Sequence, residues 1–171
     1  MIGLKRNTVK LEEYNPLWQE EFKKEKEILS SVLGNEVLGI YHIGSTAIPG
    51  IHAKPIIDIA VEVNSFKVLD LLDDKLQERN IIYRPMHDGP GERLYIKGDN
   101  DFRTHHIHFY EKDNLKLKDD LFFRDYLISH PDVANEYDKL KTKLAENYAN
   151  DREKYTKSKK DFIENVLKER K

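Results

Sequence analysis

Residues 37–63 read VLGIYHIGSTAIPGIHAKPIIDIAVEV and hold two apolar, β-branched runs joined by a turn-rich segment. The first run, Val37 to Ile43, predicts a strand that ends at the small polar residues Gly44-Ser45-Thr46. In the second run, every odd position from 57 to 63 is Ile or Val, and the even positions are Asp58, Ala60 and Glu62. Because successive side chains of a strand point to opposite faces, we expect Asp58 to face away from the core.

Helical patterns flank these two strands. Asn15-Pro16 is a helix start signal before apolar residues at helical spacing up to Gly34, and a second helical pattern covers residues 66–79 before a short strand at 81–83. Residues 93–97 and 104–110 alternate apolar and polar side chains and predict a hairpin. From about residue 118 onward the chain is predicted to be helical, with helices over 121–130, 133–148 and 158–169.

The predicted fold class is α+β, with a mixed β-sheet, helices packed on one face, and a helical C-terminal extension. At 171 residues the chain has the usual size of one domain, which we place at 1–171 with about 118–171 as its helical part. The absence of cysteine excludes a disulfide scaffold, a thiol nucleophile and a Cys-ligated zinc.

Charge and hydropathy limit the classes of partner that the protein can bind. No apolar stretch approaches the roughly 20 residues that span a bilayer, and the start lacks the apolar region of a signal peptide, so we expect a cytoplasmic protein without a membrane partner. Because 29 Lys+Arg stand against 31 Asp+Glu, nucleic-acid binding would require a local basic patch, which the sequence neither shows nor excludes. No partner protein can be read from the sequence.

The segment Gly44-Ser45-Thr46 follows a predicted strand and is a candidate phosphate-binding loop. Glycine lets backbone N–H groups approach a phosphate closely, and the two hydroxyls add donors. The alternative is a turn chosen for its conformation alone. His42 and His52, on either side of this loop, are weaker candidates.

Asp58 lies thirteen residues after Ser45, on the polar side of the next strand. A carboxylate there can hold Mg²⁺ beside a bound polyphosphate, or it can simply be solvated or paired with an arginine. Glu62 is about 13 Å further along the strand and is too distant to share one ion with Asp58. The position that could share the ion is occupied by Ala60.

In the strand predicted over residues 104–110, His106 and His108 share the polar face. Both suit metal binding or acid–base chemistry. Arg93 and Tyr95 on the neighbouring strand are expected to lie on the same face and to add anion-binding groups. The alternative is a pair of surface histidines.

The C-terminal helices are rich in basic residues. Arg124 is a candidate phosphate ligand, and Lys141, Lys143, Lys157, Lys159 and Lys160 could line a basic lip. Because acidic residues are interleaved with these lysines, we interpret them as solvated helix faces.

Several segments together resemble the GrpB family. They are YHIGSTAIPG at 41–50, KPIIDI at 54–59, HIH at 106–108, FRDYL at 123–127 and His130-Pro131, with looser matches near Asp151, Tyr155 and Lys160. The match extends over nearly the whole chain, and the run from His42 to Asp58 is its most specific part.

This resemblance implies a nucleotidyltransferase-like fold of the DNA polymerase β superfamily. Members of that superfamily have a Gly-Ser loop after one strand and a carboxylate-x-carboxylate pair on the next, where metal ions are held. Gly44-Ser45 and Asp58 match two of these features, but Ala60 stands in the place of the second acid. The resemblance thus implies Mg²⁺ or Mn²⁺ at Asp58, with His106 and His108 as candidate replacement ligands.

The leading hypothesis is binding of a nucleotide or other phosphorylated small molecule together with a divalent metal, with nucleotidyl transfer as a further step. The phosphate-binding candidates are Gly44, Ser45, Thr46, Lys54, Arg93 and Arg124, and the catalytic and metal-binding candidates are Asp58, His106 and His108. The alternative is a catalytically inert binding or folding-accessory module, related to the domain fused to dephospho-CoA kinase. The sequence leaves open whether the protein is an enzyme.

Overall fold

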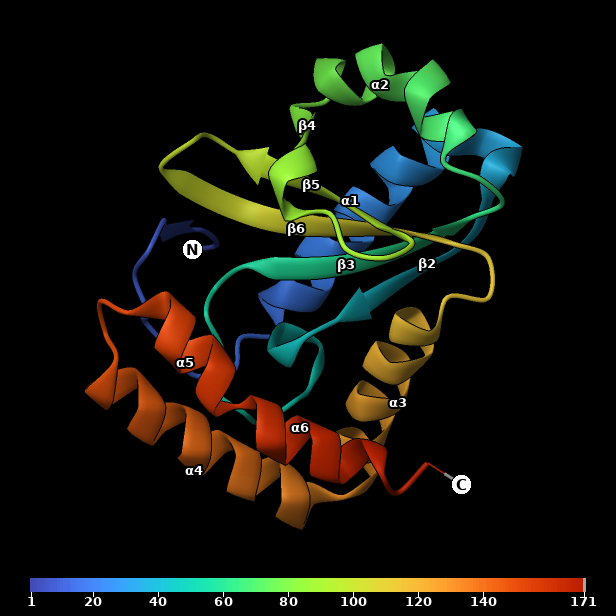
Figure 1. Ribbon diagram of the computed structural model, residues 1–171. Coiled ribbons are helices and arrows are strands. Elements are labelled where there is room, and N and C mark those ends of the chain that lie inside the picture. The colour runs from blue at the N-terminus through green and yellow to red at the C-terminus, as the bar shows by residue number, and fades with distance from the viewer. Residues whose placement is uncertain (171) are drawn as a thin grey trace.

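A six-stranded mixed sheet forms the centre of the protein (Figure 1), which we describe from a computed structural model over residues 1–170. The strand order is β2-β3-β6-β5-β4, and β1 pairs with β6. The strands are β1 (Leu4–Lys5), β2 (Val37–Ile43), β3 (Ile57–Val63), β4 (Ile81–Tyr83), β5 (Glu92–Gly98) and β6 (Phe102–Glu111).

Strand β3 is the central element because it pairs antiparallel with β2 and parallel with β6. Its odd-numbered Ile and Val side chains are fully buried in the main hydrophobic core, as their alternation predicts. Helices α1 (Leu17–Leu33) and α2 (Lys67–Glu78) cover this face, and Trp18 of α1 is completely buried against it. Asp58 points to the opposite face, as expected.

The opposite face is partly covered by helices from the C-terminal third of the chain (Figure 1). These are α3 (Leu115–Ser129), α4 (Pro131–Asn147), α5 (Arg152–Ser158) and α6 (Lys160–Leu167). Leu117 of α3 packs against Ala60 and Tyr110 of the sheet, and α3, α4 and α6 form a second apolar cluster with Ile48 and Ile51. The expected α+β class with a mixed sheet is confirmed, and α3 adds a helix on the second face. Within residues 1–170, none of the helices combines the length and apolarity needed to cross a bilayer.

The hairpin of β5 and β6 forms as predicted, but the expectation that Arg93 and Tyr95 share the face of His106 and His108 is wrong. Continuing the pairing of Gly98 with Arg103 would place Arg93 opposite His108. Instead, a register shift between Lys97 and Gly98 places Leu94 there. Such a bulge adds one residue to one strand and so moves each later side chain to the other face.

Gly98 permits this bulge. Its φ of +116° is a conformation that L side chains rarely adopt, and a Cβ there would collide with the carbonyl of Phe102. Arg93 consequently lies on the face covered by α2, where its Nη1 donates to Asp70 Oδ1 at 2.6 Å and its guanidinium lies over the Phe66 ring. It is therefore separated by the sheet from the histidines.

The first prediction concerns His105 of β6, which is only 4% exposed. Burial, with Lys97 nearby, lowers its pKa from 6.5 to about 4. Between these values the unfolded chain binds a proton that the folded chain does not, so the free energy of unfolding must decrease as pH falls from about 6.5 to 4. Between pH 7 and pH 5, we expect the free energy of unfolding of His105→Gln to fall by about 2 kcal/mol less than that of the wild type, measured by urea denaturation. Equal losses in the two proteins would contradict this assignment.

Candidate functional site

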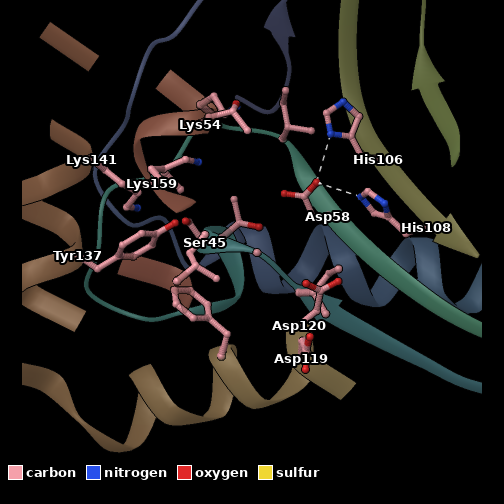
Figure 2. A pocket seen from close by; sticks show the side chains of 18 of the residues that line it. Ser45, Lys54, Asp58, His106, His108, Asp119, Asp120, Tyr137, Lys141 and Lys159 are labelled. Carbon is pink, nitrogen blue, oxygen red and sulfur yellow. Dashed lines mark hydrogen bonds and ion pairs between the residues drawn. The ribbon is translucent and has the colours of Figure 1, made fainter. Parts of the chain in front are cut away.

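A cavity of about 320 Å³ lies between the polar face of the sheet and helices α3 to α6. Its walls come from distant parts of the sequence: the loop after β2, strands β3 and β6, and the four C-terminal helices. Figure 2 shows their side chains converging on this space.

The Gly44-Ser45-Thr46 loop, which follows β2, forms one part of the cavity wall. Gly44 has a φ of +71°, and a Cβ on it would lie 2.6 Å from Asp58 Oδ2, so the loop and the carboxylate need a glycine between them. Residues Ser45–Ala47 form a short 3-10 turn. The hydroxyls of Ser45 and Tyr137 face each other at the edge of the cavity (Figure 2).

His42, near the end of β2, holds this loop in place. Its Nδ1 donates to Gln19 Oε1 at 3.1 Å, which leaves Nε2 to accept from Thr46 Oγ1 at 2.9 Å. The ring also stacks on Phe22, with 4.9 Å between ring centres. Burial lowers the pKa of His42 to about 4, so the ring is neutral at pH 7 and suits this structural role.

Asp58 is the centre of a chain of acidic and imidazole groups across three strands. His106 Nδ1 donates to Asp58 Oδ1 at 3.2 Å, and His108 Nε2 lies 3.8 Å from the same oxygen (Figure 2). On its other side, His108 Nδ1 donates to Glu92 Oε1 at 2.6 Å. The parallel register that sets Asp58 opposite His106 and Ala60 opposite His108 produces this arrangement.

The protonation states within this chain differ. Burial alone would lower the pKa of His108, but the carboxylates of Asp58 and Glu92 raise it to about 9. Burial lowers the pKa of His106 and outweighs its single bond to Asp58. Burial alone would raise the pKa of Asp58, but His106 and His108 hold it well below its ordinary value. At neutral pH the group therefore holds an ionised Asp58, a charged His108 and a neutral His106.

A cluster of basic side chains lies across the cavity from the histidines. Lys54 follows the loop, Lys141 comes from α4, and Lys159 stands between α5 and α6, with Arg152 at the start of α5. Lys141 Nζ is 4.9 Å from the centre of the Tyr137 ring, and Lys159 Nζ is 4.4 Å from that of Tyr155. Lys141 also donates to the carbonyl of His52.

None of the four basic residues makes a salt bridge to a carboxylate of residues 1–170. Burial and the neighbouring cations lower the pKa of Lys54 to about 7, and burial lowers that of Lys141 to about 7 and that of Lys159 to about 8. A desolvated cation without an acidic partner is costly to a folded protein. The cavity therefore holds four basic groups that no carboxylate of residues 1–170 pairs with, and an anionic ligand would favour their charged forms.

The donor groups do not fit the divalent ions expected from the sequence. Mg²⁺ and Mn²⁺ prefer several oxygen ligands, yet Oδ1 of Asp58 already accepts from His106. The other carboxylates of the cavity are also paired, Asp120 with Lys116 at 3.0 Å and Asp119 with Arg170. Among residues 1–170, no three His, Asp or Glu side chains are arranged to hold one ion.

The structure brings most of the candidate residues to one cavity, namely Gly44, Ser45, Thr46, Lys54, Asp58, His106 and His108. Arg93 lies on the other side of the sheet, as described above. Arg124 is not part of the cavity wall: its Nη1 donates to the carbonyl of His42 at 2.9 Å, so it supports the strand end before the loop.

The site also contains Glu92, which the sequence pattern does not single out, and two lysines for which the predicted exposure is wrong. Lys143, Lys157 and Lys160 are exposed as expected, but Lys141 is 1% exposed, and both it and Lys159 line the cavity. A signal was available, because Tyr137 and Lys141, and likewise Tyr155 and Lys159, stand four residues apart. Side chains at that spacing share a helix face, which indicates a common buried wall rather than solvated lysines.

The second prediction concerns the fit between Gly44 and Asp58. We expect Gly44→Ala to reduce the free energy of unfolding by at least about 1 kcal/mol more than Gly50→Ala, measured by chemical denaturation. Gly50 is the matched control because it also has a positive φ, +83°, but a Cβ on it meets nothing within 4 Å. Equal losses would show that Asp58 does not constrain the loop.

Comparison with known proteins agrees with the resemblance seen in the sequence. The model of the GrpB protein family matches residues 8–169. The glutamate-rich protein GrpB of Alkalihalophilus pseudofirmus is 37% identical over 173 residues, covering 99% of both chains. UPF0157 protein YqkA of Bacillus subtilis is 41% identical over 150 residues, which cover 88% of this chain but only 43% of that relative.

A solved structure gives the same result. The crystal structure of the conserved protein GrpB from Enterococcus faecalis superimposes with a TM-score of 0.87 at 37% identity, covering 94% of this chain and 96% of that one. The chain therefore belongs to the GrpB family.

Proposed function

We propose that the cavity binds a nucleotide or another phosphorylated small molecule, with its phosphates between the Gly44-Ser45-Thr46 loop and the basic cluster. One observation carries the proposal: Lys54, Lys141, Lys159 and Arg152 line the cavity without a carboxylate partner among residues 1–170. A phosphate chain supplies the missing negative charge and several strong acceptor oxygens.

Apolar side chains in the cavity wall support a ligand with an apolar part in addition to its phosphates. Phe123 of α3 and Ile163 and Leu167 of α6 line the cavity. Apolar and aromatic side chains with a few placed polar groups are typical of small-molecule sites. A nucleotide, which combines a phosphate chain with a flat base, has both kinds of surface.

The proposal is binding and does not include transfer of a nucleotidyl group. A two-metal transfer needs carboxylates that hold both ions, and the second acid of the carboxylate-x-carboxylate pattern is replaced by Ala60. Ala60 is fully buried in a small apolar cluster with Ile43, Tyr110 and Leu117.

Thermal unfolding of the purified protein tests the proposal. Because a ligand that binds only the folded state raises the apparent stability, nucleoside mono-, di- and triphosphates, coenzyme A and pyrophosphate are compared at millimolar concentration. We expect at least one nucleotide to raise Tm by several degrees more than sodium chloride or sulfate at the same ionic strength. If no phosphorylated compound exceeds the salts, the proposed function is wrong.

A further prediction concerns Lys54, whose effects on stability and on ligand binding are expected to differ in sign. Because its folded pKa of about 7 lies below the ordinary 10.5, the unfolded chain holds the proton more tightly, and neutral pH favours unfolding. We expect Lys54→Met to raise the free energy of unfolding at pH 7 by at least about 1 kcal/mol and to remove the stabilisation by a nucleotide.

Lys160→Met is the matched control, because Lys160 is an exposed lysine that forms an ion pair with Glu164 on α6. The control should retain both the wild-type stability and the ligand effect, since surface ion pairs contribute little. A Lys54→Met protein that is less stable, or that still responds fully to the nucleotide, would contradict the role assigned to Lys54.

A further inference from the structure

The carboxylate at the centre of the cavity already has cationic and hydrogen-bonding partners within the chain. Both histidine nitrogens that face Asp58 approach the same oxygen, Oδ1, at 3.2 Å from His106 and 3.8 Å from His108. Behind His108, Glu92 accepts at 2.6 Å and holds the ring in place. A metal ion at Oδ1 would have to displace these donors and break a hydrogen-bonded chain across three strands.

The surroundings of Asp58 are also unfavourable for a second cation. Lys54 and Lys159 are close enough to experience the charge of Asp58, and both line the same cavity. A divalent ion beside Asp58 would face these ammonium groups and Arg152 across a partly desolvated space, where like charges repel strongly. The same groups attract a polyanion.

We infer that the cavity binds its phosphorylated ligand as the metal-free anion, with the basic cluster supplying the positive charge that Mg²⁺ supplies in metal-dependent phosphate sites. This inference rests on the proposed function and defines the chemical form of the ligand. It departs from the divalent ion that the family resemblance implies, because Oδ1 of Asp58 faces the two histidines and Oδ2 lies against Gly44.

The experiment measures binding of inorganic tripolyphosphate and ATP to the purified protein by isothermal titration calorimetry. Titrations run in EDTA, in excess MgCl₂ and in excess MnCl₂ at equal ionic strength. We expect binding in EDTA, weakened about threefold or more by Mg²⁺, because the ion competes with the lysines for the phosphate oxygens. Binding that requires either metal, or is at least tenfold tighter with it, overturns the inference and leaves the proposed function standing. Absence of binding in all three conditions overturns both.

For Asp58→Asn, the expected change in ligand affinity is opposite to that expected of a metal site. The amide keeps an oxygen that can accept from His106 but removes a negative charge beside the bound phosphates, so tripolyphosphate in EDTA should bind about threefold to tenfold more tightly. Loss of a metal ligand would instead weaken binding in excess MgCl₂, so a folded variant that binds more weakly than the wild type, in EDTA or in MgCl₂, contradicts the inference.

Glu92→Gln provides a second, independent variant. It also removes a negative charge at nearly constant shape, but Glu92 is separated from the cavity by His108. Tighter binding of tripolyphosphate in EDTA is again expected, by a smaller factor than for Asp58→Asn because the charge is further away. Thermal unfolding of each variant without ligand identifies a folding defect, and weaker binding by folded Glu92→Gln counts against the inference.

Discussion

The parallel pairing of β3 with β6 is the constraint on which the rest of the structure depends. It sets Asp58 opposite His106 on one face of the sheet and, one residue later, Ile59 opposite Ile107 on the other. A slip of one residue would move the carboxylate into the apolar core beneath α1 and expose the isoleucines. The hydrophobic face that stabilises the sheet and the polar face that forms the cavity are therefore fixed by the same register.

The basic residues that suit the cavity for binding also reduce the stability of the folded protein. Three lysines are held in a partly desolvated space, and each of them lies over a tyrosine ring instead of pairing with a carboxylate. The attraction between an ammonium group and a ring face is weaker than a buried ion pair, so part of the desolvation cost is not recovered within the chain. Stability is lost at a functional site in this way because the compensating charge belongs to the ligand.

Much of the fold could be predicted from local patterns. The start signal at Pro16, the alternation of β3 and the Gly-Ser turn each act through nearby residues, and the structure agrees with them. The face of Arg93 could not be predicted, because a single bulge at Gly98 reverses it and the alternation of β5 is unchanged by that shift. The positive φ of Gly98 is a property of the folded hairpin, not of the sequence.

The site was predicted more completely on its strand side than on its helix side. Strand residues such as Asp58 and His106 stand out because a polar group interrupts an apolar pattern. Lys141 lies among charged residues of both signs on α4, and only its contact with distant segments, including the carbonyl of His52, buries it. Long-range packing of that kind leaves almost no mark on local composition.

The hydrophobic interior is divided into separate clusters, and the cavity lies between them. One cluster joins α1 and α2 to the sheet, and another joins α3, α4 and α6 to the segment after the Gly-Ser turn. Lys54 on the sheet side and Lys141, Lys159 and Arg152 on the helix side bring like charges to this boundary without a carboxylate partner among residues 1–170. A polyanion in the cavity would contact groups from both sides and act as a crosslink between the C-terminal helices and the sheet.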